Sequence, residues 1–292
     1  MSGQQRRERE PPWATLPNTA VEFGSDWKLM ADSYSHLRRT DEGSVATVTL
    51  ARPEAHNALN ALLVREISRC FEELAEDEGV RVVVLTGEGP SFCAGADVGY
   101  MRDTAGLSYE ENLEDARRLA DMFLAVVELP KPVVARVRGA AIGGGAGLVA
   151  TADVAVAEEG TRFAFSEVRL GIAPATIAPF VVHKIGYSQA RALFLSGERF
   201  GAGRGRDIGL VHEVVPEAEL DAAVERTVAL LLQGGPAAQA AIKEALRQIE
   251  ATEPMEALGI MTQLIAELRV GEEGQEGLEA FLERREPFWR ST

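Results

Sequence analysis

The chain has 292 residues, 46% hydrophobic and 26% charged, which is the composition of an ordinary globular protein with ample core. Lys and Arg number 30 against 45 Asp and Glu, and the net charge of −15 argues against a nucleic-acid partner. No apolar run has the length of a membrane span, and the two cysteines, Cys70 and Cys93, suggest no disulfide framework. We therefore expect a cytoplasmic protein without a membrane partner.

The first half of the chain begins with an irregular segment and then alternates strands and helices. Residues 1–32 are polar, contain prolines and show no periodicity, so we expect a flexible extension. The hydrophobic patterns predict strands at 35–39, 45–50 and 80–85 and helices at 62–75 and 110–128. The run at 80–85 is continuously apolar, which is typical of a strand buried on both faces.

The second half turns from mixed elements to helices alone. We predict strands at 133–137, 154–157 and 210–215, and helices at 146–152, 177–185 and 188–195, with a break at Gly186-Tyr187. Four further helices are expected at 219–233, 236–250, 254–269 and 274–284. A helical tail needs a surface to pack on, which favours an interface with other subunits.

Two glycine-containing turns can each offer backbone N–H groups to a ligand. Gly143-Gly144-Gly145 lies between a predicted strand and a helix, where the first N–H groups of the helix lack partners. These donors and the helix dipole can hold a developing negative charge. The segment fits neither a phosphate loop nor a dinucleotide fingerprint. A second turn, Ala94-Gly95-Ala96-Asp97, can supply another N–H, although either turn alone is also compatible with a tight connection.

Glu167 is the candidate acid/base residue. It follows Phe163 and Phe165 in an apolar segment, so burial is expected to raise its pKa into a range that suits proton transfer. The alternative is a solvated carboxylate on a short element. The four histidines share no metal-ligand spacing, so we expect no metal site. Arg136 and Arg138 are candidates to bind a carboxylate of a ligand, and the alternative is that they pair with local acids.

Five ordered segments resemble the crotonase family, also called enoyl-CoA hydratase/isomerase. They are ARPEAHNALN (51–60), VVVLTGEGPSFCAGADV (82–98), PVVARVRGAAIGGGAGLVATADVAVA (132–157), FAFSEVRLGIAP (163–174) and EGLEAFLERREPFW (276–289). The resemblance covers about residues 35–290 and implies an α/β crotonase fold, a spiral of ββα units with a helical C-terminal trimerisation region. It implies a core at 33–218 and a helical region at 219–292 that forms trimers or pairs of trimers and completes the site.

The resemblance also implies an acyl-CoA thioester substrate, with coenzyme A as part of the substrate and no separate cofactor. The thioester carbonyl would lie between the N–H groups of Ala96 and Gly144, with Glu167 as the catalytic base. The remaining residues implied to bind substrate are Arg52, for the phosphates, Ala58 and Ala94, for the adenine end, and Gly95, Asp97, Gly143 and Gly147.

Gly147 departs from the family pattern, because family hydratases have a second glutamate at this position. A single carboxylate can still activate water and return the proton, which predicts a hydratase, or it can move a double bond as a 3,2-enoyl-CoA isomerase. The sequence of residues 166–186 looks most like the same segment of bacterial family members that are assigned to branched-chain acid breakdown. These members hydrate methylglutaconyl-CoA or related branched, carboxylated thioesters. The missing side chain is expected to leave room, without a repelling charge, for a branched or carboxylated acyl group.

Other classes of function are less well supported by the residues. A hydrolase or decarboxylase of the same fold has no specific motif in its favour. A non-enzymatic binding protein of this fold is disfavoured by the intact donor turns together with Glu167, and an RNA-binding version by the negative charge.

Overall fold

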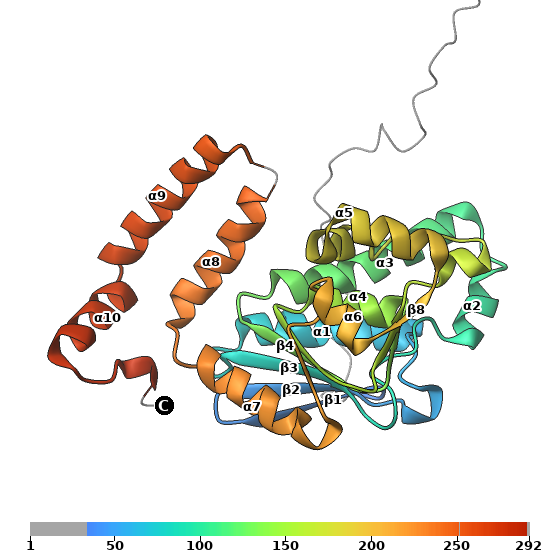
Figure 1. Ribbon diagram of the computed structural model, residues 1–292, viewed down its shortest axis with the longest axis horizontal. Coiled ribbons are helices and arrows are strands. Elements are labelled where there is room, and N and C mark those ends of the chain that lie inside the picture. Colours follow the sequence, from blue (N-terminus) through green and yellow to red (C-terminus); the bar gives the residue numbers. More distant parts are fainter. Residues whose placement is uncertain (1–33, 251, 291–292) are drawn as a thin grey trace, which may run out of the picture. The chain divides into compact units, whose positions relative to one another are not determined.

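The structure is a computed structural model that describes residues 34–250 and 252–290. The expected flexible extension at 1–32 lies outside these described residues. The described chain combines a mixed β-sheet, covering helices and a helical C-terminal region, which confirms the α/β class (Figure 1).

A six-stranded sheet forms the centre of the fold. Its order is β1 (Leu37–Glu42), β2 (Val45–Leu50), β3 (Val82–Gly87), β4 (Val133–Val137), β6 (Val154–Glu158) and β9 (Glu213–Val215). Only the β1–β2 pair is antiparallel, and every other neighbouring pair is parallel. A smaller sheet, which the sequence did not predict, joins β5 (Ala140–Ile142), β7 (Arg162–Ala164) and β8 (Arg199–Gly201).

The central strand β3 contacts a hydrophobic cluster on each of its two faces. Val83 and Leu85 belong to the larger core, which also contains buried side chains of α1 (Ala61–Glu76), α3 (Tyr109–Glu128), α4 (Gly144–Thr151) and α5 (Ala178–Ser196). Val82 and Val84 belong to a smaller cluster with α7 (Leu220–Leu231). Burial of β3 on both faces, expected from its continuous apolar run, is confirmed.

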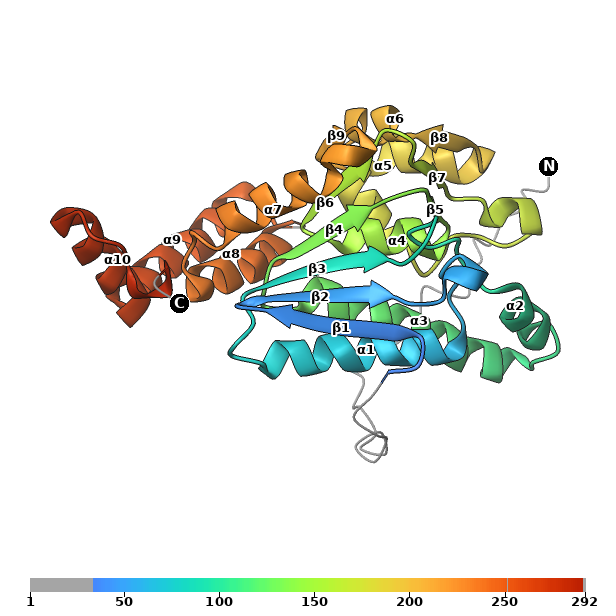
Figure 2. The same ribbon diagram turned by 90° about the horizontal axis from the view of Figure 1, so that it is seen from below.

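The helices of the larger core follow the predicted pattern. Figure 2 shows α1 and α3 side by side along one face of the sheet, and their buried residues share one cluster. The helix α5 is kinked at Gly186, whose φ of 76° and ψ of 153° are not helical, so the predicted break is confirmed. Two short helices, α2 (Val98–Thr104) and α6 (Ala202–Asp207), were not predicted.

The C-terminal region consists of α8 (Pro236–Ile249), α9 (Pro254–Val270) and α10 (Glu272–Glu283). Lys243 of α8 connects this region to the sheet, because its Nζ donates to Lys131 O (3.0 Å) and to Asp153 Oδ2 (2.7 Å). Asp153 Oδ2 also accepts the N–H of Val133 at the start of β4 (2.7 Å). No helix within residues 34–250 and 252–290 is long and apolar enough to cross a membrane.

Candidate active site

The loops after β2, β3 and β4 leave the sheet at the same edge, because these strands are parallel neighbours. They contain the motif segments 51–60, 88–97 and 138–143. Ligands of open parallel sheets bind outside the carboxyl ends of the strands. The topology therefore brings together the segments that the sequence analysis singled out.

Asn57 joins two of these loops. Its side chain is fully buried, its Oδ1 accepts the N–H of Arg52, and its Nδ2 donates to the carbonyl oxygens of Glu88 and Ser91, all at 2.8 Å. A buried amide with all these bonds made fixes loop positions, because breaking one of them leaves a polar group unpaired. This role of Asn57 was not predicted, although the residue lies within the HNALN motif.

The N–H of Ala96 points away from the loop 51–60, on which Ala96 packs. Leu59 bridges to it in parallel: the N–H of Leu59 donates to Gly95 O (2.7 Å), and the N–H of Asp97 donates to Leu59 O (2.9 Å). In such a bridge the middle residue has its own N–H and C=O on the opposite side. Ala96 is exposed, and its N–H donates no backbone hydrogen bond among the described residues, so it is available to a ligand.

Gly144 begins α4 and provides a second N–H without an intrahelical acceptor. The start of α4 packs closely on the segment 93–97. A Cβ on Gly145 would lie 2.8 Å from Cys93 Cβ, and a Cβ on Gly95 would lie 2.9 Å from Ile142 O. Only glycine permits this backbone approach, which places the segments that contain the two free N–H groups against each other.

Glu167 lies over the glycine turn (Gly143–Gly145). It begins a 3₁₀ turn, Glu167–Leu170, that follows β7, and Phe165 anchors this segment by packing edge-on against Phe194 with 5.2 Å between ring centroids. A Cβ on Gly143, whose φ is 52°, would lie 2.9 Å from Glu167 Oε1. The backbone of Gly143 is tied to β7 by a 2.8 Å bond from its N–H to Ala164 O.

The environment of the Glu167 carboxyl suits proton transfer. Burial raises the pKa of Glu167 above the ordinary carboxyl value, as expected from its apolar neighbours. Its Oε2 is buried and has no hydrogen-bond partner among the residues that the structure describes. An unpaired buried oxygen is costly in a folded protein, so it marks a position at which a substrate group or a water molecule is expected.

The structure corrects the expectation of open space at Gly147. This residue is buried in α4, and a Cβ there would collide with Cγ2 of Ile177 and lie 3.1 Å from both Ile177 Cβ and Phe123 Cε1. The place of the absent glutamate side chain is therefore filled by two apolar side chains. The pairing was not predicted because Ile177 and Phe123 are distant from Gly147 in the sequence.

Arg52 pairs with Asp97 rather than pointing freely into solvent. Its Nη2 lies 3.0 Å from Asp97 Oδ2, its Nη1 donates to Ala58 O (2.6 Å), and both charged side chains are largely buried. Asp97 also caps α2 by accepting the N–H groups of Gly99 and Tyr100. Burial alone would raise the pKa of Asp97, but these hydrogen bonds and the guanidinium lower it overall.

The main-chain groups of the two expected adenine contacts are partly engaged within the loops. The C=O of Ala58 accepts Arg52, and the N–H of Ala94 donates to His56 O (2.9 Å). The Arg52–Asp97 pair and these bonds hold the loop at 51–60 against the segment 93–97, which contains Ala96.

Arg52→Met is expected to lower the stability of the protein by about 2–3 kcal/mol, because it leaves a largely buried carboxylate without its cation. It should lower kcat more than it raises KM, since the pair positions the segment of Ala96. Chemical denaturation and steady-state kinetics would measure both effects, with exposed Arg206→Met as the control. A large rise in KM at unchanged kcat would instead indicate a direct contact with the coenzyme A phosphates.

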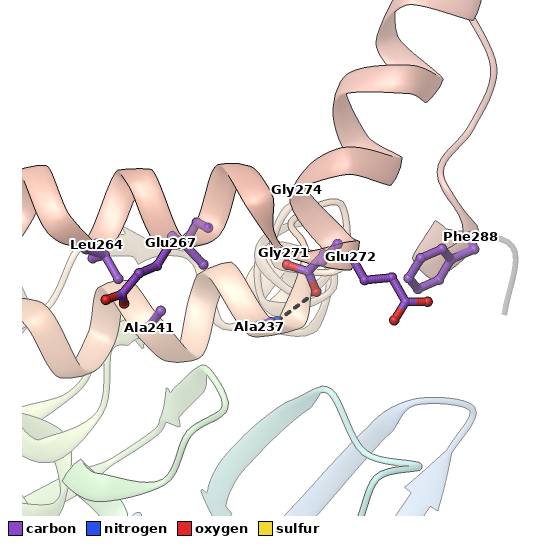
Figure 3. Close-up of a pocket in the computed structure, with 10 residues that line it drawn as sticks. Ala237, Ala241, Leu264, Glu267, Gly271, Glu272, Gly274 and Phe288 are labelled. Carbon is purple, nitrogen blue, oxygen red and sulfur yellow. Dashed lines mark hydrogen bonds between the residues drawn. The ribbon is translucent and has the colours of Figure 1, made fainter.

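Two cavities lie outside this arrangement. One, of about 490 Å³, is an open pocket between α8, α9 and α10, and Figure 3 shows Ala237 and Ala241 of α8 facing Leu264 and Glu267 of α9. The other, of about 670 Å³, lies between α3, α4, α5 and α8 and is lined in part by Asp153, Lys184 and Lys243. Burial lowers the pKa of Lys184 to about 8. Neither cavity is lined by Glu167, Ala96 or Gly144.

Arg136 and Arg138 each face an acidic partner. Arg136 Nε donates to Asp221 Oδ1 of α7 (2.5 Å), and Arg138 Nε lies 3.7 Å from Glu217 Oε1. The structure thus favours their pairing with local acids.

Comparison with known proteins identifies the family to which this chain is similar. Residues 40–292 match the family described as enoyl-CoA hydratase/isomerase. The 2,3-dehydroadipyl-CoA hydratase of Escherichia coli is 34% identical over 88% of this chain and 99% of its own. An enoyl-CoA hydratase of Mycobacterium tuberculosis is 33% identical over 85% of this chain and 94% of its own. The crystal structure of an enoyl-CoA hydratase from Shewanella pealeana is 36% identical and superposes with a TM-score of 0.85 over 87% of this chain and 96% of that one.

The chain belongs to the enoyl-CoA hydratase/isomerase family and has the crotonase fold. Its relatives are named as hydratases, and it is an enzyme of the enoyl-CoA hydratase type.

Proposed function

We propose that the protein adds water to the double bond of a 2-enoyl-CoA thioester, or removes it in reverse, with Glu167 as its single acid/base. The observation that carries the proposal is the Glu167 carboxyl over the glycine turn, with one buried oxygen unpaired and the free N–H groups of Ala96 and Gly144 on adjoining segments. The reaction requires no cofactor, because coenzyme A is part of the substrate.

In the proposed reaction, ionised Glu167 takes a proton from water while the hydroxyl oxygen bonds to Cβ. The electron pair of the double bond moves toward the thioester, and negative charge develops on its carbonyl oxygen. The N–H groups of Ala96 and Gly144 stabilise this charge, each contributing on the order of 3 kcal/mol. Protonated Glu167 then returns its proton to Cα, which gives the 3-hydroxyacyl-CoA and restores the carboxylate.

The second candidate function is a 3,2-enoyl-CoA isomerase. It is favoured by the filled position at Gly147, because moving a double bond needs one base and no water. Glu167 would remove a proton from Cα and return it to Cγ, the far end of the original Cβ–Cγ double bond, so that the double bond moves to Cα–Cβ, with the same N–H groups stabilising the enolate.

The acyl group and the assembly are finer parts of the proposal. A branched, carboxylated group such as 3-methylglutaconyl is supported by the sequence at 166–186 and by the missing charge at Gly147, whereas the filled space there speaks against it. Trimers or pairs of trimers are supported by α9, which buries no side chain and exposes Met255 and Val270. A cytoplasmic location is supported by the free thiols of Cys70 and Cys93.

Turnover of the purified protein on crotonyl-CoA, 3-methylglutaconyl-CoA and a 3-enoyl-CoA tests the proposal. We expect hydration of a 2-enoyl-CoA. It can be measured as the loss of absorbance of the conjugated thioester. Conversion of the 3-enoyl-CoA alone would make the protein an isomerase. Thioester binding without turnover of any of the three would contradict both proposals and favour a binding protein of this fold.

A further inference from the structure

Two side chains cover Gly147 and are themselves firmly held. Ile177 immediately precedes α5, is 2% exposed, and its C=O accepts the N–H of Val181 (3.0 Å). Phe123 of α3 is fully buried and packs against Phe180 with 5.8 Å between ring centroids. Neither side chain is free to swing away, because both are packed into the core.

The same apolar surface continues to the start of α4. A Cβ on Gly144 would lie 2.7 Å from Leu59 Cδ1 and 3.9 Å from Phe123 Cζ. Leu59, Phe123 and Ile177 therefore form one wall along the glycine side of α4, which we call the α4 wall. Glu167 contacts α4 from a different direction, over Gly143.

The α4 wall has chemical consequences for a bound acyl group. Its three side chains offer no hydrogen-bond donor or acceptor, so they can neither orient a water molecule nor compensate a buried charge. A carboxylate placed against the wall would lose its hydration without gaining a partner. The three side chains are themselves at most 3% exposed, so the wall leaves no open space beside Gly147 for a bulky acyl substituent.

We propose that Ile177 determines the specificity of the site: it occupies the place of a second acid/base side chain and restricts the part of the acyl group beside Gly147 to uncharged, apolar chemistry. The inference rests on the proposed function at Glu167 and names the acyl class for it. It predicts that crotonyl-CoA is preferred to 3-methylglutaconyl-CoA and that Ile177 sets this preference.

A pair of alanine variants tests the specificity. Ile177→Ala should raise the kcat/KM ratio of 3-methylglutaconyl-CoA to crotonyl-CoA about tenfold, because it opens space beside Gly147. Ile185→Ala is the matched control: it removes an isoleucine of α5 that is also buried and is not among the nearest neighbours of a Cβ at Gly147. Its ratio should stay at the wild-type value. An unchanged ratio in Ile177→Ala, or the same change in both variants, would overturn the proposal.

A double-mutant cycle, measured by thermal unfolding, tests the packing of Ile177 on Gly147 and does not depend on turnover. Gly147→Glu should lower Tm by about 5 °C, because its Cβ collides with Ile177. Ile177→Ala should lower Tm in the wild-type background but raise it in the Gly147→Glu background, whereas Ile185→Ala should lower it in both. Equal losses from Ile177→Ala in the two backgrounds would refute the role of Ile177. If the variants give the expected changes in Tm but the wild-type protein turns over none of the thioesters, only the proposed reaction is refuted.

Discussion

Glu167→Gln is expected to lower kcat for hydration about 1,000-fold while KM changes little, because the amide keeps the shape of the carboxyl but cannot accept and return the proton. Stopped-flow or steady-state absorbance of the enoyl thioester would measure the loss. The matched control is Glu159→Gln, at an exposed carboxylate, which should retain wild-type kcat. Retention of more than about a tenth of wild-type kcat in Glu167→Gln would assign the proton transfer to another group.

The pH dependence of this reaction follows from the same carboxyl. Glu167 must be ionised to take a proton from water, so kcat/KM should rise as pH rises through its pKa in the free enzyme. Since burial raises that pKa, the rise should come at higher pH than for an exposed carboxylate. The Glu167→Gln variant should lack this limb of the profile.

Stability should change in the opposite sense to activity. The folded protein holds the Glu167 proton more tightly than the unfolded chain does, so this group lowers stability as pH rises from the ordinary carboxyl pKa to the raised one. Glu167→Gln removes the charge from a site with an unpaired oxygen and should raise Tm at neutral pH by about 2–4 °C. This gain should vanish in acid, where both states of the wild type are protonated.

Gly145→Ala is expected to damage both the fold and the proposed oxyanion donors, Ala96 and Gly144. Its Cβ would collide with the carbonyl oxygen of Cys93 and lie 2.9 Å from the carbonyl carbon, so α4 must move off the segment 93–97. We expect a stability loss of about 3 kcal/mol. We also expect an at least 100-fold loss of kcat, because the segments that contain the N–H groups of Gly144 and Ala96 would be pushed apart. Denaturant unfolding and kinetics at a temperature where the variant is folded would measure the two effects.

The control for this substitution is Gly203→Ala in α6. A Cβ there would meet no atom of residues 34–250 and 252–290 within 4 Å, and alanine favours a helix over glycine, so this variant should be neutral or slightly stabilised. A Gly145→Ala protein with wild-type kcat would show that the approach of α4 to Cys93 does not position the donors.

The sequence predicts the elements whose pattern is long enough to be read. Val45–Leu50 appears with the predicted bounds, because its apolar residues alternate over six positions. The strands of the small sheet were missed, since Ala140–Ile142, Arg162–Ala164 and Arg199–Gly201 have three residues each and show no period. The helix α2 was also missed, although Asp97 is a capping residue at its start.

The features of the site also divide into those that a local motif predicts and those that depend on tertiary packing. Ala96, Gly144 and Glu167 were chosen from local motifs, and the structure brings their segments together. The contact between Gly147 and Ile177 is a packing event between two helical elements, and no local pattern encodes it. The expected space at Gly147 was wrong for this reason: a missing side chain indicates a cavity only when no neighbour fills it.

The C-terminal end of α4 is held by residues of later helices, so the part of the enzyme that contains α4 cannot easily be separated from them. Lys184 of α5 donates to the C=O of Ala152, directly after α4, at 2.6 Å, and Lys243 of α8 holds the adjacent Asp153. A fragment cut before residue 219 would lose Lys243 and, with α7, the cover of Val82 and Val84. The helix that presents Gly144 at one end would then have a loosened support at the other. Grafting the sheet and α4 onto another scaffold would therefore require transplanting the tail helices as well, since Gly144 and the supporting Lys243 come from different halves of the chain.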